Sequence, residues 1–593
     1  MKQRGLSLVK STRFRLLARL PTFLVSFLGV WFLSLGLPKA SARNLLIRGG
    51  TLIDGTGRPP IPDARILVEG NTIRAIWSGD AAAQNVPSDT LVLDARGKFI
   101  LPGLIDSHVH YRPYMGELFL AYGVTAVYDL GDPIYWNAAV KKGLNSGKIR
   151  GPRFYFCAEL EIAAEGVGGE GRRAPAVAAR SVASLQTPAD AKGAVAVVKA
   201  TSDCIKLSEF TKGDFFAAIA HEGRAVGLNV ISHSLNAVES AGWGIGGMEH
   251  MTGVALSTIR SPEGRKAVEG MTIEAGHKNS FLYQWMEPAF FDEVIRHLIE
   301  SNVFLNPTLH FEWKALTEHA RDHELEDTRL LNNPGLQYVP LDERLVTLGQ
   351  YHWADKRSSA EKEQFLKGYR RVQEFLRRFV KAGGKIYAGT DSAAATTPGL
   401  SLHHEMELLV DAGLSPMEAI LSATKWGAEV IGLGRGLDKQ LGTVETNKLA
   451  DLVILRSNPL EDIRRTKEIE QVIRDGEIAD ISFHSDYQFP FPRYGPESKH
   501  LYNPVPVLLD ITPPVAVQGG EVKLRVVGRG LVPSSVVYLG NLAVPTTWVS
   551  PRELSVALPS AQTARPGTFL ITVQTPKPGG GISEAVEFIV NFP

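Results

Sequence analysis

Between residues 100 and 433 the sequence alternates short apolar runs with longer stretches of helical periodicity. This alternation limits the fold more than any other feature, because repeated strand-helix units are typical of a parallel sheet covered by helices, and eight of them close into a (β/α)8 TIM barrel. We expect barrel strands near residues 100–105, 124–128, 154–157, 204–207, 229–232, 246–249, 303–307 and 385–389.

The segments on either side of this barrel region have a different sequence pattern. Short β-like runs broken by turn residues occupy 43–103 and 434–485 and predict one composite β-sandwich built from both flanks of the barrel, which itself spans 104–433. A long charged stretch at about 311–380 predicts a helical insertion, either a lid or a solvated helical pair. A linker at 486–504 leads to an all-β pattern at 505–593.

The first 42 residues predict a signal peptide. They contain seven basic and no acidic residues, an apolar run and a small-x-small ending at Ala40-Ser41-Ala42. Removing them takes the formal net charge from +1 to −6. We therefore expect an exported protein, periplasmic or secreted; an uncleaved membrane anchor is the alternative, because the apolar run approaches the length of a bilayer span.

Composition limits the chemistry. With 44% hydrophobic and 21% charged residues the chain is globular, and the near-zero net charge without a basic patch argues against a nucleic-acid partner. Two cysteines are too few for a Cys-based zinc cluster, so His, Asp, Glu or Lys must hold any metal. Cys157 and Cys204 fall on neighbouring predicted strands; a disulfide is conceivable outside the cytoplasm, but the register that it needs favours two buried thiols.

Side chains that can bind metal stand at the carboxyl ends of several predicted strands. His108 and His110 close the first strand, and both imidazoles can reach one cation because side chains two apart on a strand share a face. Active sites of barrels form at these ends. The further residues there are Lys206 on the fourth strand, His233 on the fifth, His250 on the sixth and Asp391 on the eighth. For His233 and His250 the alternative is a packing role in the barrel.

Five motifs carry a family resemblance. LPGLIDSHVH at 101–110 is followed by GVTAVYDLG at 123–131, GTDS at 389–392, LHHEMELL at 402–409 and LADLV at 449–453. Together they resemble the amidohydrolase superfamily, specifically its imidazolonepropionase-like and prolidase-like branch, over about residues 44–485.

The resemblance implies two divalent metal ions, usually zinc. His108, His110 and Asp391 would hold the more buried ion, and His233 and His250 the more exposed one. Lys206 would bridge both as N6-carboxylysine, because burial beside cations favours a free amine that can add carbon dioxide, supplied as bicarbonate. The alternative is a Lys206 ammonium paired with Asp203 or Glu209.

The implied reaction is hydrolysis of a carbonyl by hydroxide that bridges the two ions. Asp391 would move the proton to the leaving nitrogen, so Asp391 and Lys206 are the predicted catalytic residues. Tyr111, Arg112 and His310 are predicted substrate contacts, with Arg112 suited to a dipeptide carboxylate; surface or packing roles are the alternatives.

The sequence therefore predicts an exported dinuclear metal-dependent hydrolase of amide bonds, either a prolidase-like dipeptidase or an N-acyl amino acid amidase. A hydrolase of lactones, other esters or cyclic amides is the alternative within enzymes, since the same centre acts on any polarised carbonyl. An inactive envelope binding protein is the alternative from another class.

The C-terminal unit resembles the IPT/TIG domains over nearly its whole length, with Gly519-Gly520-Glu521 and Pro566-Gly567 as its turn signals. This resemblance implies an immunoglobulin-like sandwich that contacts the envelope or a protein. The full predicted fold is thus α/β, a TIM barrel with a composite β-sandwich, plus a C-terminal all-β Ig-like sandwich. The sequence leaves homo-oligomerisation open.

Overall fold

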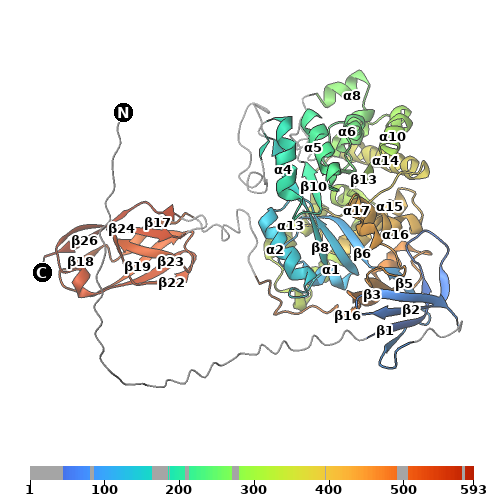
Figure 1. Cartoon of the computed structure of the whole chain (residues 1–593). Coiled ribbons are helices and arrows are strands. Elements are labelled where there is room, and N and C mark those ends of the chain that lie inside the picture. The colour runs from blue at the N-terminus through green and yellow to red at the C-terminus, as the bar shows by residue number, and fades with distance from the viewer. Residues whose placement is uncertain are drawn as a thin grey trace, which may run out of the picture. The chain divides into compact units, whose positions relative to one another are not determined.

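A computed structural model describes residues 44–79, 86–162, 184–185, 187–207, 213–269, 280–393, 395–490, 505–576 and 581–592 (Figure 1). The predicted signal peptide and most of the predicted linker lie outside these residues. Within the described part of the chain, no helix combines the length and the apolar character needed to cross a membrane.

A curled parallel sheet forms the centre of the main domain, in the order β13-β12-β11-β10-β8-β7-β6. Helices surround it in Figure 1, as expected for a TIM-like barrel. Its strands are β6 (Leu104–Val109), β7 (Val124–Asp129), β8 (Arg153–Ile162), β10 (Cys204–Leu207), β11 (Asn229–Ser232), β12 (Gly247–Glu249) and β13 (Phe304–Asn306), with the short β9 (Ser184–Leu185) beside β8.

Helices lie between and after these strands. They are α1 (Gly116–Ala121), α2 (Ile134–Asn145), α4 (Ala191–Val198), α5 (Gly213–Ala225), α6 (Ala237–Trp243), α7 (Thr252–Thr258), α8 (Pro262–Ala267), α10 (Phe291–Glu300), α11 (Leu309–Trp313), α15 (Leu400–Asp411), α16 (Pro416–Ser422) and α17 (Lys425–Gly432).

The eighth predicted strand closes the barrel without being a regular strand. Residues 385–392 make isolated bridges, Leu305 with Ile386 and Val109 with Ser392. Tyr387 N–H donates to Leu305 O at 3.0 Å and Asp391 N–H donates to His108 O at 2.8 Å, so the segment joins β13 to β6. The closure is confirmed, but as backbone bridges rather than a strand.

The bounds predicted for the first barrel strand are wrong. Residues Phe99–Pro102 form β5, which belongs to a different sheet, and the barrel strand β6 starts only at Leu104. Gly103 separates the two. A Cβ atom there would lie 2.0 Å from Oγ1 of Thr125, so only glycine allows the chain to pass between the sheets at this point.

Strands from both flanks of the barrel form one eight-stranded sheet, in the order β16-β15-β14-β5-β1-β2-β3 with β4 beside β1. The antiparallel pairing of β14 with β5 sets Ile454 opposite Ile100 and links the two flanks. The remaining bounds are β1 (Leu45–Leu52), β2 (Ile61–Glu69), β3 (Thr72–Ser78), β4 (Leu91–Asp94), β14 (Leu452–Leu455), β15 (Ile469–Arg474) and β16 (Glu477–Ala479).

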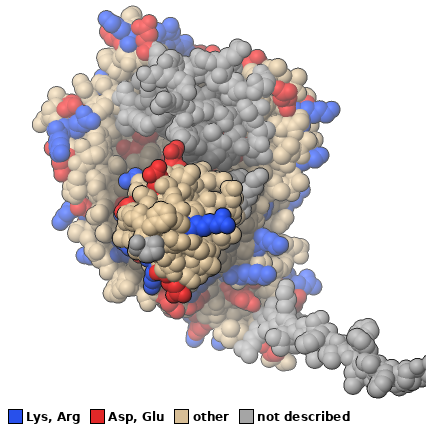
Figure 2. Space-filling view, turned by 90° about the vertical axis from the view of Figure 1, so that its left-hand side faces the viewer, with Lys and Arg blue, Asp and Glu red and all other residues tan. Residues whose placement is uncertain are grey.

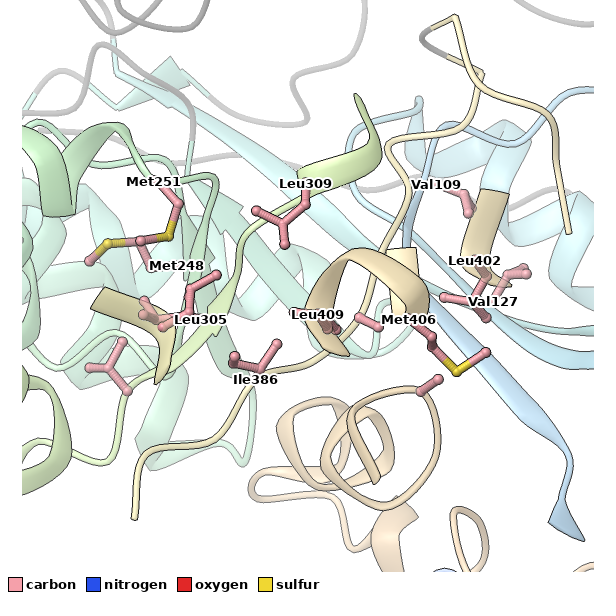
Figure 3. Packing of buried hydrophobic residues seen from close by; sticks show 14 of the residues in the cluster. Val109, Val127, Met248, Met251, Leu305, Leu309, Ile386, Leu402, Met406 and Leu409 are labelled. Atoms are coloured by element: carbon pink, nitrogen blue, oxygen red, sulfur yellow. The ribbon is translucent and has the colours of Figure 1, made fainter. Parts of the chain in front are cut away.

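The main core lies between the barrel strands and the helices outside them. Figure 3 shows Val127 of β7, Met248 of β12, Leu305 of β13 and Leu402 and Met406 of α15 in one cluster, all of them buried. Burying such apolar side chains contributes roughly 1.5–3 kcal/mol each. This core fixes the carboxyl ends of the strands, where the predicted site residues stand.

The insertion after β13 is helical, as expected. It comprises α12 (Ala320–Leu331), α13 (Leu341–Gly349) and α14 (Ser359–Lys381). Phe365, Phe375 and Phe379 of α14 are fully buried in the main core, so this helix packs into the domain along one face. The role of the insertion as a lid stays a prediction.

The C-terminal unit is an all-β sandwich with its own core. One sheet has the order β17-β19-β23-β22 and the other β18-β26-β24-β20-β21, with β25 beside β24. Leu524, Val556 and Phe588 are fully buried between them. The strands are β17 (Val507–Thr512), β18 (Val515–Val517), β19 (Val522–Arg529), β20 (Val536–Leu539), β21 (Leu542–Ala543), β22 (Thr546–Ser550), β23 (Glu553–Leu558), β24 (Gly567–Thr575), β25 (Gly581–Ile582) and β26 (Val586–Asn591).

Charged side chains of both signs alternate over the molecular face in Figure 2. This agrees with the nearly balanced totals of 64 Lys plus Arg and 63 Asp plus Glu.

The two cysteines form a disulfide, which corrects the expectation of two thiols. Cys157 of β8 and Cys204 of β10 stand directly opposite each other in the parallel register, with their Cα atoms 4.3 Å apart. The register requirement that argued against a bridge is therefore met. The bridge joins the strand that carries Lys206 to its neighbour.

Candidate functional site

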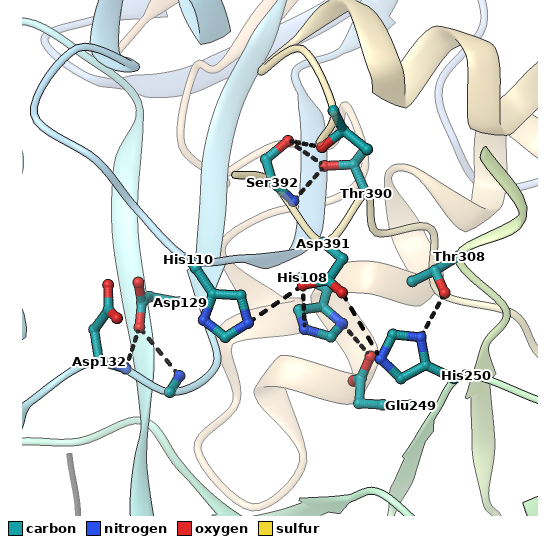
Figure 4. Close-up of polar contacts among 12 residues, drawn as sticks. His108, His110, Asp129, Asp132, Glu249, His250, Thr308, Thr390, Asp391 and Ser392 are labelled. Atoms are coloured by element: carbon teal, nitrogen blue, oxygen red, sulfur yellow. Dashed lines mark hydrogen bonds and ion pairs between the residues drawn. The ribbon is translucent and has the colours of Figure 1, made fainter. Parts of the chain in front are cut away.

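The structure brings predicted site residues together at the carboxyl ends of the barrel strands (Figure 4). His108 lies in β6, with His110 just beyond it, and Asp391 follows the closing segment. Nε2 of His110 lies 3.2 Å from Oδ1 of Asp391, and Nε2 of His108 lies 3.4 Å from the same oxygen. One ligand atom of each lies within 4.8 Å of those of the other two, which is a donor set that a divalent cation can gather.

His250 and His233 extend this set. The ring centroids of His108 and His250 are 5.4 Å apart, and those of His250 and His233 are 5.1 Å apart. Nε2 of His250 also lies 4.0 Å from Oδ2 of Asp391. The rings of His250 and His233 therefore continue the row of imidazoles that begins at His108.

Lys206 is buried on β10, with only 3% of its surface exposed. The register sets it opposite Glu159 of β8. Asp203 and Glu209 are the two alternative partners of a Lys206 ammonium. Asp203 is bound by Nζ of Lys141 at 2.6 Å, and Glu209 lies outside the described residues. Together with His108, the charge of Lys206 holds the pKa of Glu249 below its ordinary value, so Lys206 lies within electrostatic reach of the site.

Sequence analysis did not identify Glu249, which fixes His108 from behind. Its Oε2 lies 2.5 Å from Nδ1 of His108, and it accepts hydrogen bonds from Tyr387 Oη at 2.6 Å and Asn306 Nδ2 at 2.9 Å. A carboxylate on the second ring nitrogen orients a histidine so that Nε2 faces a metal. The only sequence signal was its position beside His250.

Thr308 and Asp106, which the sequence did not indicate either, hold two other parts of the site in place. Thr308 Oγ1 lies 2.7 Å from Nδ1 of His250, which leaves Nε2 of that ring directed at Asp391. Asp106 accepts hydrogen bonds from Thr390 Oγ1 at 2.7 Å and from the Thr390 N–H at 3.1 Å, and so anchors the residue before Asp391. Burial raises the pKa of Asp106 to about 7 in spite of these hydrogen bonds.

Glu249 and His108 shift each other's pKa in opposite directions. Burial alone would lower the pKa of His108, but the carboxylates of Glu249 and Asp391 raise it above its ordinary value. Burial alone would raise the pKa of Glu249, but His108 and Lys206 hold it below its ordinary value. The lowered pKa of Glu249 keeps this carboxylate ionised, so that it can accept the Nδ1 proton of a neutral His108 and leave the Nε2 lone pair for a metal.

The backbone is strained where it presents these side chains. Asp391, His250 and Thr308 have φ angles of 53°, 58° and 46°, a region that residues other than glycine seldom adopt. Gly389 allows the close approach of this loop to β6, because a Cβ there would lie 2.6 Å from Cβ of His108. Such strain is typical of functional sites.

The three predicted substrate contacts are all buried and have other neighbours. The Tyr111 ring is fully buried, with Phe154 at 5.3 Å and Phe119 at 6.2 Å between centroids. Arg112 donates through Nη1 to the His110 carbonyl at 2.8 Å and lies 3.3 Å from Asp132. His310 is fully buried beside two other histidines. The burial of Arg112 excludes the surface role that was its alternative, and the role of all three as substrate contacts stays a prediction.

Comparisons with known proteins agree with this geometry. Residues 246–479 match the amidohydrolase family and residues 506–590 match the IPT/TIG domain. The chain carries an amidohydrolase family domain followed by an IPT/TIG domain. The fold of the amidohydrolase domain is that of a Xaa-Pro dipeptidase structure with bound methionine in the active site (TM-score 0.51, 20% identity, 74% of this chain and 100% of that chain).

A structure of a putative prolidase from Bifidobacterium longum is similar as well, with a TM-score of 0.52 and 22% identity over 74% of this chain and 95% of that chain. Among curated proteins, a dihydroorotase of Thermoanaerobacter sp. (strain X514) is 41% identical over 70 residues, or 12% of this chain. The chain covers only 14% of that relative's length.

The residues of the amidohydrolase domain fit divalent metal. Imidazole and carboxylate donors converge, their outer atoms are held by Glu249 and Thr308, and a buried lysine stands at the same strand ends. His108, His110 and Asp391 would hold one ion, and His233 and His250 a second.

Proposed function

We propose that this chain is an exported metal-dependent hydrolase of amide bonds, a prolidase-like dipeptidase or an N-acyl amino acid amidase. The observation that carries the proposal is the Asp391 carboxylate, whose two oxygens face His108, His110 and His250 within 4.0 Å. Zinc is the expected metal, because imidazole and carboxylate donors suit it.

Two divalent ions held there would polarise a substrate carbonyl and lower the pKa of water toward neutrality. Asp391 is placed to accept the proton that water loses and to return it to the leaving nitrogen, because its carboxylate lies among the ligands and is 8% exposed. Glu249 and Thr308 hold two of the imidazoles in one orientation, so the donors are arranged before substrate arrives.

Lys206 is proposed to bridge the ions as N6-carboxylysine. Its burial at the carboxyl ends of the barrel strands supports this proposal, because a buried amine close to cations loses its proton readily and can then add carbon dioxide. The disulfide between Cys157 and Cys204 supports export to an oxidising compartment. The IPT/TIG domain is proposed to contact an envelope component or another protein.

The test is a panel of dipeptides, N-acyl amino acids and lactones, offered to the full chain after reconstitution with zinc and bicarbonate. Amide turnover that the Asp391→Asn variant loses while it keeps its fold supports the proposal. Turnover of lactones alone selects the ester alternative. A zinc-loaded chain that hydrolyses none of the panel contradicts the proposal and leaves a binding protein in its place.

A further inference from the structure

A second histidine cluster lies among helices outside the barrel-mouth set and shares no residue with it. His310 is on α11, His323 on α12 and His404 on α15. The rings are 5.4 Å apart for His310 and His323, 4.8 Å for His310 and His404, and 3.8 Å for the stacked pair His323 and His404. We call these three residues the helical histidine cluster.

The outer nitrogens of two of these rings are held by carboxylates. Nε2 of His404 lies 2.8 Å from Oε2 of Glu326, and Nε2 of His323 lies 3.0 Å from Oε2 of Glu407. This arrangement fixes the tautomer, because a ring that donates from Nε2 carries its lone pair on Nδ1. Carboxylates placed in this way are the usual outer partners of metal-binding histidines.

The inner nitrogens have no hydrogen-bond partner among the described residues. Nδ1 of His323, Nδ1 of His404 and both nitrogens of His310 are buried without one. The three residues are no more than 1% exposed. Leaving polar atoms buried and unpaired costs roughly 1–3 kcal/mol each, so a cluster of them in one place calls for a ligand.

Charged groups of both signs surround the helical histidine cluster. Nζ of Lys467 lies 2.7 Å from Glu326 and 2.8 Å from Glu407, so one ammonium faces two carboxylates. Burial lowers the pKa of His310 and of His404 well below the ordinary value, and both rings are therefore neutral and able to donate a lone pair.

A path from solvent reaches the cluster. A cavity of about 800 Å³ is lined by His323 together with Glu326 and Glu407, and its rim includes Asp322 and Lys467. This cavity therefore reaches the two carboxylates that hold the outer nitrogens of His323 and His404.

We propose that His310, His323 and His404 bind a divalent transition-metal ion of the zinc type. One ring nitrogen of each lies within 4.8 Å of those of the other two. Zinc at its usual bond length needs ligand nitrogens about 3.4 Å apart, so small side-chain rotations complete the site and leave a fourth position for water or an anion. The ion ties the inserted helix α12 to α11 and α15.

The test counts zinc per chain in the Lys206→Ala background, where the barrel-mouth ions are expected to be weakened. We compare this chain with the same chain carrying His404→Gln or His310→Gln. The matched control is His403→Gln, the neighbouring buried histidine, whose ring nitrogens already bind Thr466 at 2.8 Å and the Tyr122 carbonyl at 2.9 Å.

We expect one zinc equivalent to disappear with His404→Gln and with His310→Gln and to remain with His403→Gln. His319→Gln should also keep it, because Nε2 of His319 is held by Asp411 at 2.8 Å. Zinc lost with His319→Gln and kept with His310→Gln would overturn the proposal in favour of a different donor set, His319, His323 and Glu407. Zinc unchanged in every variant would overturn it outright.

Anomalous scattering at the zinc edge from crystals of the unmutated, zinc-loaded chain covers the case in which a variant does not fold. A peak within bonding distance of the three rings supports the proposal, and featureless density there contradicts it. Failure of the barrel-mouth site would appear separately, as zinc content that Lys206→Ala does not change.

Discussion

Nδ1 of His108 lies 2.5 Å from Oε2 of Glu249, although β6 and β12 are not neighbours in the sheet. The contact crosses the interior of the barrel and is completed by Tyr387 and Asn306, which both donate to Glu249. The orientation of His108, the first histidine of the candidate metal set, therefore depends on a carboxylate from the far side of the barrel.

Replacing Glu249 by glutamine should lower metal affinity at the barrel mouth by about 10–100-fold, since a neutral amide no longer orients and polarises His108. A competition titration with a chromophoric chelator measures this. Tyr387→Phe, which removes one hydrogen bond from Glu249 and leaves its charge, should have a smaller effect. An unchanged affinity in Glu249→Gln would show that the contact does not serve the metal.

The disulfide should stabilise the amidohydrolase domain. It closes a loop with a sequence separation of 47, for which chain entropy predicts about 4 kcal/mol of stability. Unfolding followed with and without a reductant measures this, and a Cys157→Ser/Cys204→Ser double variant should no longer respond to the reductant. Two thiols that can be alkylated in the denatured, unreduced protein would contradict the bridge.

Lys314 should make the free energy of unfolding depend on pH in the alkaline range. Its Nζ donates to the Ala395 carbonyl at 2.5 Å and to the Thr347 carbonyl at 3.2 Å, and burial lowers its pKa to about 8. The unfolded chain, with an ordinary pKa of 10.5, binds more protons between about pH 8 and 10.5. The contribution of Lys314 to stability therefore rises with pH through this window and is lowest below pH 8.

The measurement is the slope of unfolding free energy against pH, compared between the unmutated chain and Lys314→Met. The unmutated chain should gain up to about 1.4 kcal/mol more per pH unit in this window, which corresponds to one proton. Equal slopes would place the lysine pKa near its ordinary value.

Removing the IPT/TIG domain should leave the chemistry intact. Its core, with Leu524 and Phe588, is separate from the main core. A chain ending at residue 504 should keep its metal and turn over substrate within about twofold of the full chain, since domains with their own cores fold alone. Loss of turnover in a truncated chain that is folded and metal-loaded would assign this domain a part in the reaction.

Much of the architecture could be predicted because local pattern and fold agree. The strands β10 (Cys204–Leu207) and β11 (Asn229–Ser232) have the same bounds as the apolar runs that predicted them. The strand boundary near Pro102 could not be predicted, because one continuous apolar stretch contributes strands to two sheets. The two strands are separated only at Gly103, where a side chain would clash with Thr125. The closing segment also reads as a strand, but it makes only isolated bridges.

The placement of the candidate ligands at the strand ends could be predicted from the sequence, but the residues that orient them could not. Histidines and an aspartate at strand ends carry a visible spacing, whereas the contact of Glu249 with His108 depends on how the barrel closes. For Arg112 the sequence position is a poor guide to where the side chain lies. Its position beside His110 suggests the mouth of the site, but its guanidinium turns back to the His110 carbonyl and Asp132.

The central claim is a dinuclear centre that depends on Lys206, and zinc content tests it most directly. The chain and its Lys206→Ala variant are reconstituted with zinc and bicarbonate. Lys141→Ala is the control, since Lys141 pairs with Asp203, just before β10, and lies over the rings of Tyr155 and Phe156. The account predicts one to two fewer zinc ions per chain in Lys206→Ala, together with loss of hydrolysis, and no change in Lys141→Ala. Equal zinc content and equal turnover in the unmutated chain and Lys206→Ala would contradict it.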